Sequence, residues 1–146
     1  VAGDPAITKS FLLYRTYHGS AMSGAVAAAS IAAWGDESHV VDNRAQYRAK
    51  FSAVTPLLDK VLDVRLPDAS FYLWAGVPAA WQGDDTAFAR ELYRQYNVTV
   101  LPGSYLARDA QGHNPGRGRI RMALVAETSE CTEAAHRIAE FVNKGR

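Results

Sequence analysis

The chain has 146 residues, of which 16 are basic and 15 acidic, giving a formal net charge of +1. This near balance argues against a protein built mainly to bind nucleic acid, and no apolar run approaches the ~20 residues that a membrane span requires. Cys131 is the single cysteine, so a disulfide within the chain is excluded and a cytoplasmic location is expected.

The first forty residues predict two helices. Residues 4–18, DPAITKSFLLYRTYH, have a proline near the helix start and apolar residues on roughly one side, and Gly19 ends the helix. Residues 20–34, SAMSGAVAAASIAAW, are small and almost uncharged, which predicts a helix buried on every side. Alone, this surface would make the chain poorly soluble or associated. Because the chain begins with valine, we expect it to be a piece of something longer or a processed product.

Residues 38–62 form the longest helical pattern. Apolar side chains recur in it at spacings of three and four residues, which predicts a buried stripe: Tyr47, Phe51, Val54, Leu58 and Val61. The basic residues expected in solvent are Arg44, Arg48 and Lys50. Pro56 is expected to kink the helix because its ring removes a backbone donor. A long kinked helix of this kind suits a connection between two domains.

From residue 63 onward the pattern predicts the order β-β-α-β-β-α. The expected strands cover residues 63–67, 70–77, 98–103 and a segment within 117–125, and the expected helices cover residues 84–97 and 129–145. Asp84 or Asp85 is expected to cap the first of these helices. This order favours an α/β (α+β) fold in which helices cover one face of a mostly antiparallel sheet.

The last expected strand, within NPGRGRIRMALV, places arginines at every second position. In an extended chain, Arg117, Arg119 and Arg121 share one face, and the apolar residues between them share the other. The arginines could simply be solvated, or they could bind a carboxylate or phosphate through their planar guanidinium groups. Arg121 lies deepest in the apolar segment and has no acidic neighbour in sequence, so it most needs a partner.

The other reactive side chains give weaker signals. His18 ends the first helix, where an imidazole stabilises the helix dipole, although it could instead line a pocket with nearby tyrosines. The remaining histidines are too widely spaced for a zinc site, and no metal is expected. Cys131 falls on the apolar face of its helix and is expected to be an inert buried thiol.

Five segments in this order resemble the C-terminal portion of class I/II aminotransferases, which are pyridoxal-phosphate enzymes of fold type I. They are VAGDPAITKSFLLYRTYHGSAMS, SFYLW, NVTVLPGSYLAR, NPGRGRIRMALV and EAAHRIAEF. The resemblance covers essentially the whole chain. Within it, FLLYRTYHGSAM is most similar to the bacterial members that act on succinyldiaminopimelate.

The resemblance implies a domain organisation. Residues 1–37 would be the C-terminal remnant of the large cofactor-binding domain, residues 38–62 the connecting helix, and residues 63–146 the small C-terminal domain. The whole enzyme would be a homodimer whose active sites are shared at the interface.

The resemblance also assigns roles in the site. Arg121 would bind the α-carboxylate of the substrate, and Phe71 would lie close to the bound substrate. Gly103 and Ser104 would border the pocket. His18 and Ser20, on either side of Gly19, would reach toward the active site of the partner subunit. Ser20 is a candidate to contact the cofactor there.

The implied reaction moves an amino group between N-succinyl-diaminopimelate and 2-oxoglutarate, a step toward lysine. The lysine that bonds pyridoxal phosphate, and most of the groups that hold it, are expected outside this chain, so the chain alone should not transaminate. Three alternatives stay open: an aminotransferase for aspartate, alanine or aromatic amino acids, a non-catalytic α/β module that binds an anionic metabolite, and a nucleic-acid-binding sheet, which the net charge disfavours.

Overall fold

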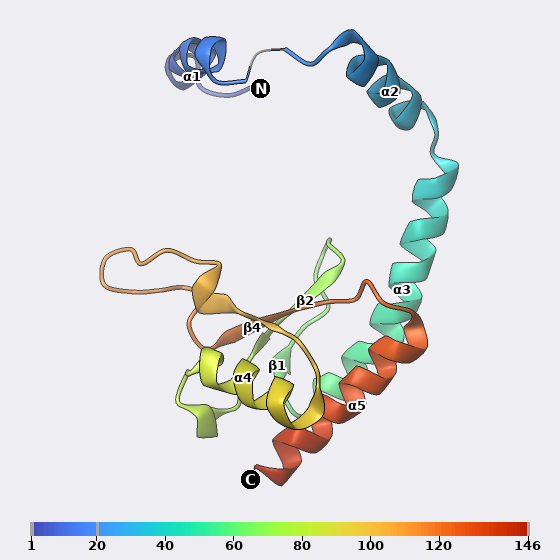
Figure 1. The fold of residues 1–146 in the computed structure, drawn as a ribbon, viewed down its shortest axis with the longest axis vertical. Coiled ribbons are helices and arrows are strands. Elements are labelled where there is room, and N and C mark those ends of the chain that lie inside the picture. The colour runs from blue at the N-terminus through green and yellow to red at the C-terminus, as the bar shows by residue number, and fades with distance from the viewer. Residues whose placement is uncertain (1, 20, 146) are drawn as a thin grey trace. The chain divides into compact units, whose positions relative to one another are not determined.

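A computed structural model describes residues 2–19 and 21–145 of the chain (Figure 1). The described chain divides into two compact units, one up to Val41 and the other from Asp42 onward. No helix among the described residues is long and apolar enough to cross a membrane.

The first unit contains helices α1 (Pro5–Tyr17) and α2 (Gly24–Gly35). The Asp4 carboxylate begins α1 by accepting the backbone N–H of Ala6 at 2.8 Å. Ser23 is the N-cap of α2, because its hydroxyl accepts a hydrogen bond from the Val26 N–H at 3.4 Å.

The prediction that α2 is buried on every side is wrong for this chain. Neither α1 nor α2 has a buried side chain, and Ile31 and Trp34 are 74% and 84% exposed. Small residues permit close packing but do not supply a neighbour, and the described part of the unit up to Val41 contains no segment that covers α2. The exposed apolar surface expected of the isolated chain is present.

Helix α3 (Ser38–Leu58) extends from the first unit into the second. It begins where expected but ends four residues early, with Pro56 in its last turn. The predicted stripe is confirmed, because Phe51, Val54 and Leu58 are buried and Tyr47 and Val61 pack against the core.

Lys50 corrects the expectation for the basic face of α3. The helical pattern predicts its side chain in solvent, but the residue is only 8% exposed. Its Nζ donates to the backbone carbonyl of Val125 at 3.5 Å and lies 5.2 Å from the centre of the Tyr47 ring. The long apolar stem therefore lies against the core while the amine reaches a carbonyl partner.

The second unit is built around a four-stranded antiparallel sheet in the order β1-β2-β4-β3. The strands are β1 (Asp63–Val64), β2 (Tyr72–Gly76), β3 (Leu101–Pro102) and β4 (Arg119–Ala123). The predicted fold class and element order are confirmed, although β1 and β3 are each two residues long, shorter than expected.

Side chains alternate between the two faces of this sheet. The buried face carries Val64, Leu73, Ala75, Pro102, Ile120 and Met122. We call the other side the open face, and its larger side chains are Asp63, Tyr72, Trp74, Leu101, Arg119 and Arg121. One face is therefore committed to the core and the other is available for a site.

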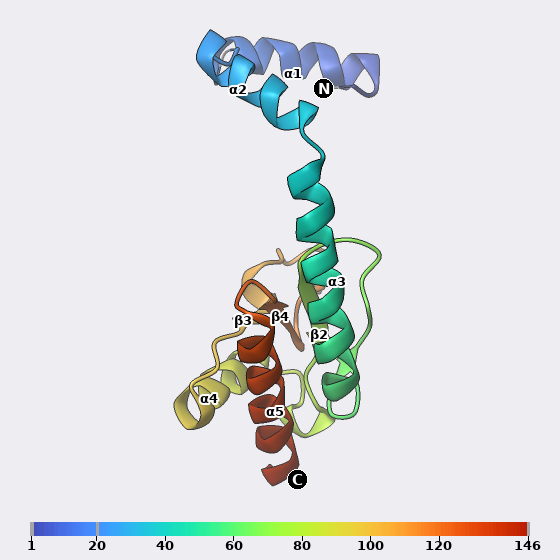
Figure 2. The same ribbon diagram turned by 90° about the vertical axis from the view of Figure 1, so that its right-hand side faces the viewer.

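Three helices pack over the buried face: the C-terminal half of α3, α4 (Asp85–Tyr96) and α5 (Thr128–Lys144) (Figures 1 and 2). The Phe88 and Phe141 rings meet edge to face at 5.3 Å between α4 and α5, a favourable aromatic geometry. Short 3₁₀ turns at Ala79–Trp81 and Gly103–Tyr105 complete the unit.

Candidate functional site

Arg121 projects from the middle of the open face. It pairs in register with Trp74 of β2 and Leu101 of β3, while its neighbours Ile120 and Met122 point into the core. Its guanidinium carbon lies 5.2 Å from the centre of the Tyr72 ring. Among the residues that the structure describes, no carboxylate or carbonyl takes up its N–H donors. The ring fixes one side of the guanidinium and leaves its planar fork available for an anion.

Arg119, two residues earlier on the same face, has a protein partner. Its Nη2 lies 3.4 Å from Oδ2 of Asp63, across the central strand β2. Gly76 lies between the two strands, and a Cβ there would be 3.1 Å from the Asp63 Cβ. The missing side chain thus lets this ion pair cross β2.

The prediction that three arginines share one face of the strand is therefore wrong for Arg117. Arg117 lies outside β4 and is exposed, because the turn at residues 114–118 delays the strand. Of the two arginines that do share the open face, Arg119 is paired with a carboxylate and Arg121 is held by a ring.

Phe71 lies immediately before β2 and is 46% exposed. Its carbonyl accepts the Leu124 N–H at 3.0 Å, which ties it to the end of β4. The Phe71 ring meets the Tyr72 ring edge to face at 5.3 Å and the Tyr47 ring at 6.1 Å. The structure thus connects Phe71 to Arg121 through Tyr72, as parts of one aromatic row.

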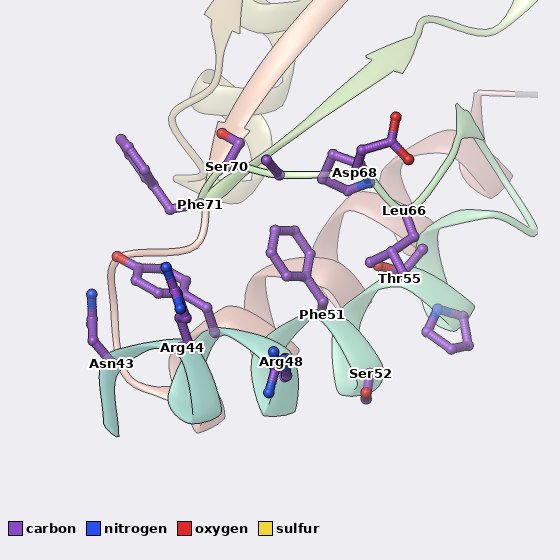
Figure 3. A pocket seen from close by; sticks show the side chains of 14 residues that line it. Asn43, Arg44, Arg48, Phe51, Ser52, Thr55, Leu66, Asp68, Ser70 and Phe71 are labelled. Carbon is purple, nitrogen blue, oxygen red and sulfur yellow. The ribbon is translucent and has the colours of Figure 1, made fainter. Parts of the chain in front are cut away.

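This aromatic row borders two grooves. Phe71 lines a groove of about 880 Å³ between α3 and residues 66–71, with Arg44 and Arg48 also lining it (Figure 3). A second groove, of about 670 Å³, follows the open face past Tyr72 and Trp74 to Arg119. Arg121 itself lines neither groove, and its connection to them is the contact of its guanidinium with the Tyr72 ring, which lines the second groove.

Gly103 and Ser104 lie at the base of the loop that precedes β4. A Cβ on Gly103 would lie 2.4 Å from the carbonyl oxygen of Gly116 and 2.7 Å from the Trp74 ring, so only glycine fits there. The Ser104 N–H donates to Oδ2 of Asp85 at 2.8 Å. The Trp74 contact places Gly103 beside the open face, whereas the Ser104 N–H is engaged with α4. The contact expected between both residues and the substrate stays a prediction.

His18 belongs to the first unit. It follows α1, and its ring stacks on the Tyr14 ring at 4.9 Å with an interplanar angle of 3°. Ser20 lies outside the described residues, so the prediction for it is not addressed. The roles expected for both residues toward a partner subunit stay predictions.

Cys131 is buried on the inner side of α5, as predicted, and its Sγ donates to the Ala126 carbonyl at 3.4 Å. Burial raises the pKa of this thiol, which keeps it protonated and unreactive near neutral pH. Within residues 2–19 and 21–145, no cluster of histidine, cysteine, aspartate or glutamate could hold a metal ion.

Sequence reasoning misses three contributors to the site. Tyr72 and Trp74 alternate on β2, and this alternation is the available signal that they face the same side as Arg121. The sequence suggests Asp85 only as a helix cap, whereas its partners lie far along the chain. No local pattern signals such contacts.

Comparison with known proteins gives a consistent result. The family model described as aminotransferase class I and II matches residues 8–138. An LL-diaminopimelate aminotransferase of Nitratidesulfovibrio vulgaris (strain DSM 19637 / Miyazaki F) is 34% identical over 119 residues, which is 80% of this chain and 29% of that protein.

Two solved structures extend the comparison. An aminotransferase from Neisseria meningitidis Z2491 has 56% identity and a TM-score of 0.81, covering 97% of this chain and 35% of its own. A probable N-succinyldiaminopimelate aminotransferase from Thermus thermophilus has 34% identity and a TM-score of 0.53, covering 65% of this chain and 23% of its own. The chain thus spans about a third of the length of the proteins that it resembles.

Proposed function

The chain belongs to the class I and II aminotransferase family, and from that premise we propose that it supplies the substrate-carboxylate clamp of a transaminase. The observation that carries the proposal is Arg121, a half-buried guanidinium without a hydrogen-bond acceptor among the described residues, held over the Tyr72 ring. The Arg121 guanidinium would donate two parallel hydrogen bonds to the α-carboxylate of a substrate.

The clamp would act on both substrates, because the amino acid and the 2-oxo acid share this carboxylate. Arg121 would bind it, and Phe71 would line the adjoining surface beside the Tyr72 ring. Holding a substrate at a fixed point orients its reacting carbon relative to the rest of the active site. Orientation is thus the contribution we assign to these residues.

Members of this family depend on pyridoxal phosphate, but the described residues do not fit its attachment. No lysine is among the described side chains that line the grooves beside the open face. The buried amine, Lys50, is engaged with the Val125 carbonyl and the Tyr47 ring. We therefore assign the cofactor to parts of the whole protein outside this chain, and derive no chemical step through it.

Two donors are supported for the whole protein. Similarity to the Thermus protein favours N-succinyl-diaminopimelate as donor, and we propose 2-oxoglutarate as the acceptor. Similarity to the Nitratidesulfovibrio protein favours LL-diaminopimelate without the succinyl group. Assaying the full-length protein with both compounds, and with aspartate, alanine and an aromatic amino acid, would separate them.

The arrangement around the clamp completes the proposal. Residues 1–37 would belong to the large cofactor-binding domain, residues 38–62 would connect the domains, and residues 63–146 would form the small domain. We further propose a cytoplasmic homodimer, in which the segment around His18 approaches the partner subunit.

Arg121→Lys in the full-length protein tests the clamp. Lysine keeps the positive charge but cannot make the paired hydrogen bonds, so kcat/KM for the amino donor should fall about 10- to 100-fold, the size of a charge-assisted pair. Arg117→Lys is the matched control and should leave kcat/KM unchanged, because Arg117 is exposed outside β4. An unchanged kcat/KM in a folded Arg121→Lys variant would rule the clamp out.

A further inference from the structure

Asp85 is a deeply buried carboxylate whose partners lie far from it in sequence. It is the first residue of α4 and only 3% exposed. Its Oδ2 accepts the Ser104 N–H at 2.8 Å, and its Oδ1 accepts the Gly118 N–H at 3.4 Å. The cap of α4 is instead Asp84, whose side chain accepts the Ala87 N–H. Asp85 is thus able to bind the loop rather than its own helix.

The two donors mark the ends of one loop. Ser104 follows β3 and Gly118 precedes β4, so the Asp85 carboxylate closes the base of the intervening residues 104–118. Asn114 adds a second connection, because its Nδ2 donates to the Ser104 carbonyl at 3.2 Å and its Oδ1 accepts the Gly116 N–H at 2.9 Å. These side-chain hydrogen bonds therefore continue the connection between the loop's two ends beyond the β3–β4 pairing, which stops at Pro102 and Ile120.

Gly118 is the point where this loop enters the site. Its φ is +74°, a conformation that favours glycine, and a Cβ there would lie 3.3 Å from the Cα of Gly83. Its carbonyl accepts the Val77 N–H at 2.9 Å. Gly118 is thus held by Asp85 and by the chain beyond β2, and the next residue begins the strand that carries Arg121.

We propose that Asp85 is a positioning residue for the carboxylate clamp: its two hydrogen bonds fix the chain entering β4 so that Arg121 emerges at the correct place on the open face. The inference rests on the proposed function of Arg121. The guanidinium fork is directional, so a shift of about 1 Å in its strand weakens the paired hydrogen bonds to substrate. A carboxylate suits the position because both of its oxygens accept, whereas an amide offers one acceptor to two N–H groups.

The test uses the full-length protein with Asp85→Asn and, as matched control, Asp84→Asn. The control removes a neighbouring charge at the same helix start, and asparagine still caps a helix. In Asp85→Asn, KM should rise about tenfold for both the amino donor and the 2-oxo acid, while kcat changes much less, because the contact is present before and during the reaction. Asp84→Asn should match the wild type. Unchanged KM values in folded Asp85→Asn would overturn the inference.

A double variant separates positioning from a general loss of structure. If Asp85 acts through Arg121, adding Asp85→Asn to Arg121→Lys should cost far less in kcat/KM than the product of the two single effects. A full multiplicative loss would show that Asp85 does not act through the clamp. If Arg121→Lys alone has no effect, the proposed function fails; if it has its effect and Asp85→Asn has none, only this inference fails.

Hydrogen exchange on the wild-type full-length protein tests the geometry without any variant. The backbone amides of Ser104 and Gly118 should exchange slowly, comparably with the paired amides of β4, because the Asp85 carboxylate engages both. Exchange as fast as at the exposed Gly112 would overturn the inference even if Asp85→Asn fails to fold.

Discussion

At the scale of single residues, partners decide what a charge can do. Arg119 and Arg121 lie two positions apart on one face of β4, yet Arg119 meets the Asp63 carboxylate and Arg121 meets a ring. Both sites are partly exposed, so the Arg119–Asp63 pair contributes little to stability. Because the Arg119 guanidinium is already paired with a carboxylate, it is less available to an anionic ligand. The Arg121 guanidinium keeps its N–H donors available for such a ligand.

The same reasoning predicts the behaviour of Cys131. Because burial raises its pKa, the thiol stays protonated at neutral pH, and only the thiolate reacts. The native 146-residue chain should therefore react slowly with a thiol reagent near neutral pH, and the rate should rise only above the pH range of an ordinary cysteine. The chain unfolded in guanidinium is the control and should react at the normal rate. Rapid stoichiometric labelling of the native chain at neutral pH would contradict the assigned burial.

At the scale of elements, the ends of helix α4 are set by residues next to them in sequence, and its position is set by side chains that pack on the core. Asp84 caps its start and Asn97, with a φ of 53°, ends it in the left-handed conformation. These are short-range features of the sequence. The Phe88 and Leu92 side chains then seat the helix on the core, where both are fully buried.

The cap of α4 gives a prediction of its own. Asp84→Ala should lower the Tm of the chain by a few degrees, while Asp84→Asn should nearly preserve it. Hydrogen bonds from the Ala87 N–H and then the Thr86 hydroxyl lower the pKa of Asp84. Because the pKa of Asp84 is lower in the folded chain than in the unfolded chain, the ionised carboxylate stabilises the folded state at pH values above the unfolded pKa. This stabilisation is lost as the pH falls through the folded pKa. The Tm difference between wild type and Asp84→Ala should therefore shrink in acid; a difference independent of pH would contradict the cap.

Comparing elements shows what local sequence can predict. The element order, α4 and its cap, and the buried stripe of α3 follow from short-range periodicity. The burial of Lys50 does not, because it depends on the carbonyl of Val125, 75 residues away. The hydrogen bonds of the Asp85 carboxylate depend likewise on backbone donors 19 and 33 residues away. Residue types predict Arg121 as a candidate, but the Tyr72 ring that holds it appears only once β2 and β4 are paired.

At the scale of the whole molecule, the buried core belongs to one unit. Every buried apolar residue of the described chain lies at or beyond Phe51, within the unit that starts at Asp42. The unit up to Val41 has helices with good caps but no buried side chain among its described helical residues. Hydrophobic burial is the main stabilising contribution to folding, so the stability of the 146-residue chain should reside in the second unit.

Separating the units tests this distribution. A chain of residues 42–146 should unfold cooperatively, with a Tm within a few degrees of the 146-residue chain, because it keeps the entire core.

The 146-residue chain should also self-associate through the apolar face of α2, where Ile31 and Trp34 are exposed. Light scattering after size exclusion should find residues 42–146 monomeric at a concentration where the longer chain associates.

The paired substitution Ile31→Ser with Trp34→Ser in the 146-residue chain is the matched variant. It removes the apolar surface without shortening the chain, and it should reduce association as truncation does while leaving the Tm unchanged. Association that persists in this variant but disappears on truncation would place the contact elsewhere in the first unit. If residues 42–146 fail to unfold cooperatively, the first unit contributes stability that its exposed side chains do not account for, and the assignment of the core to one unit is wrong.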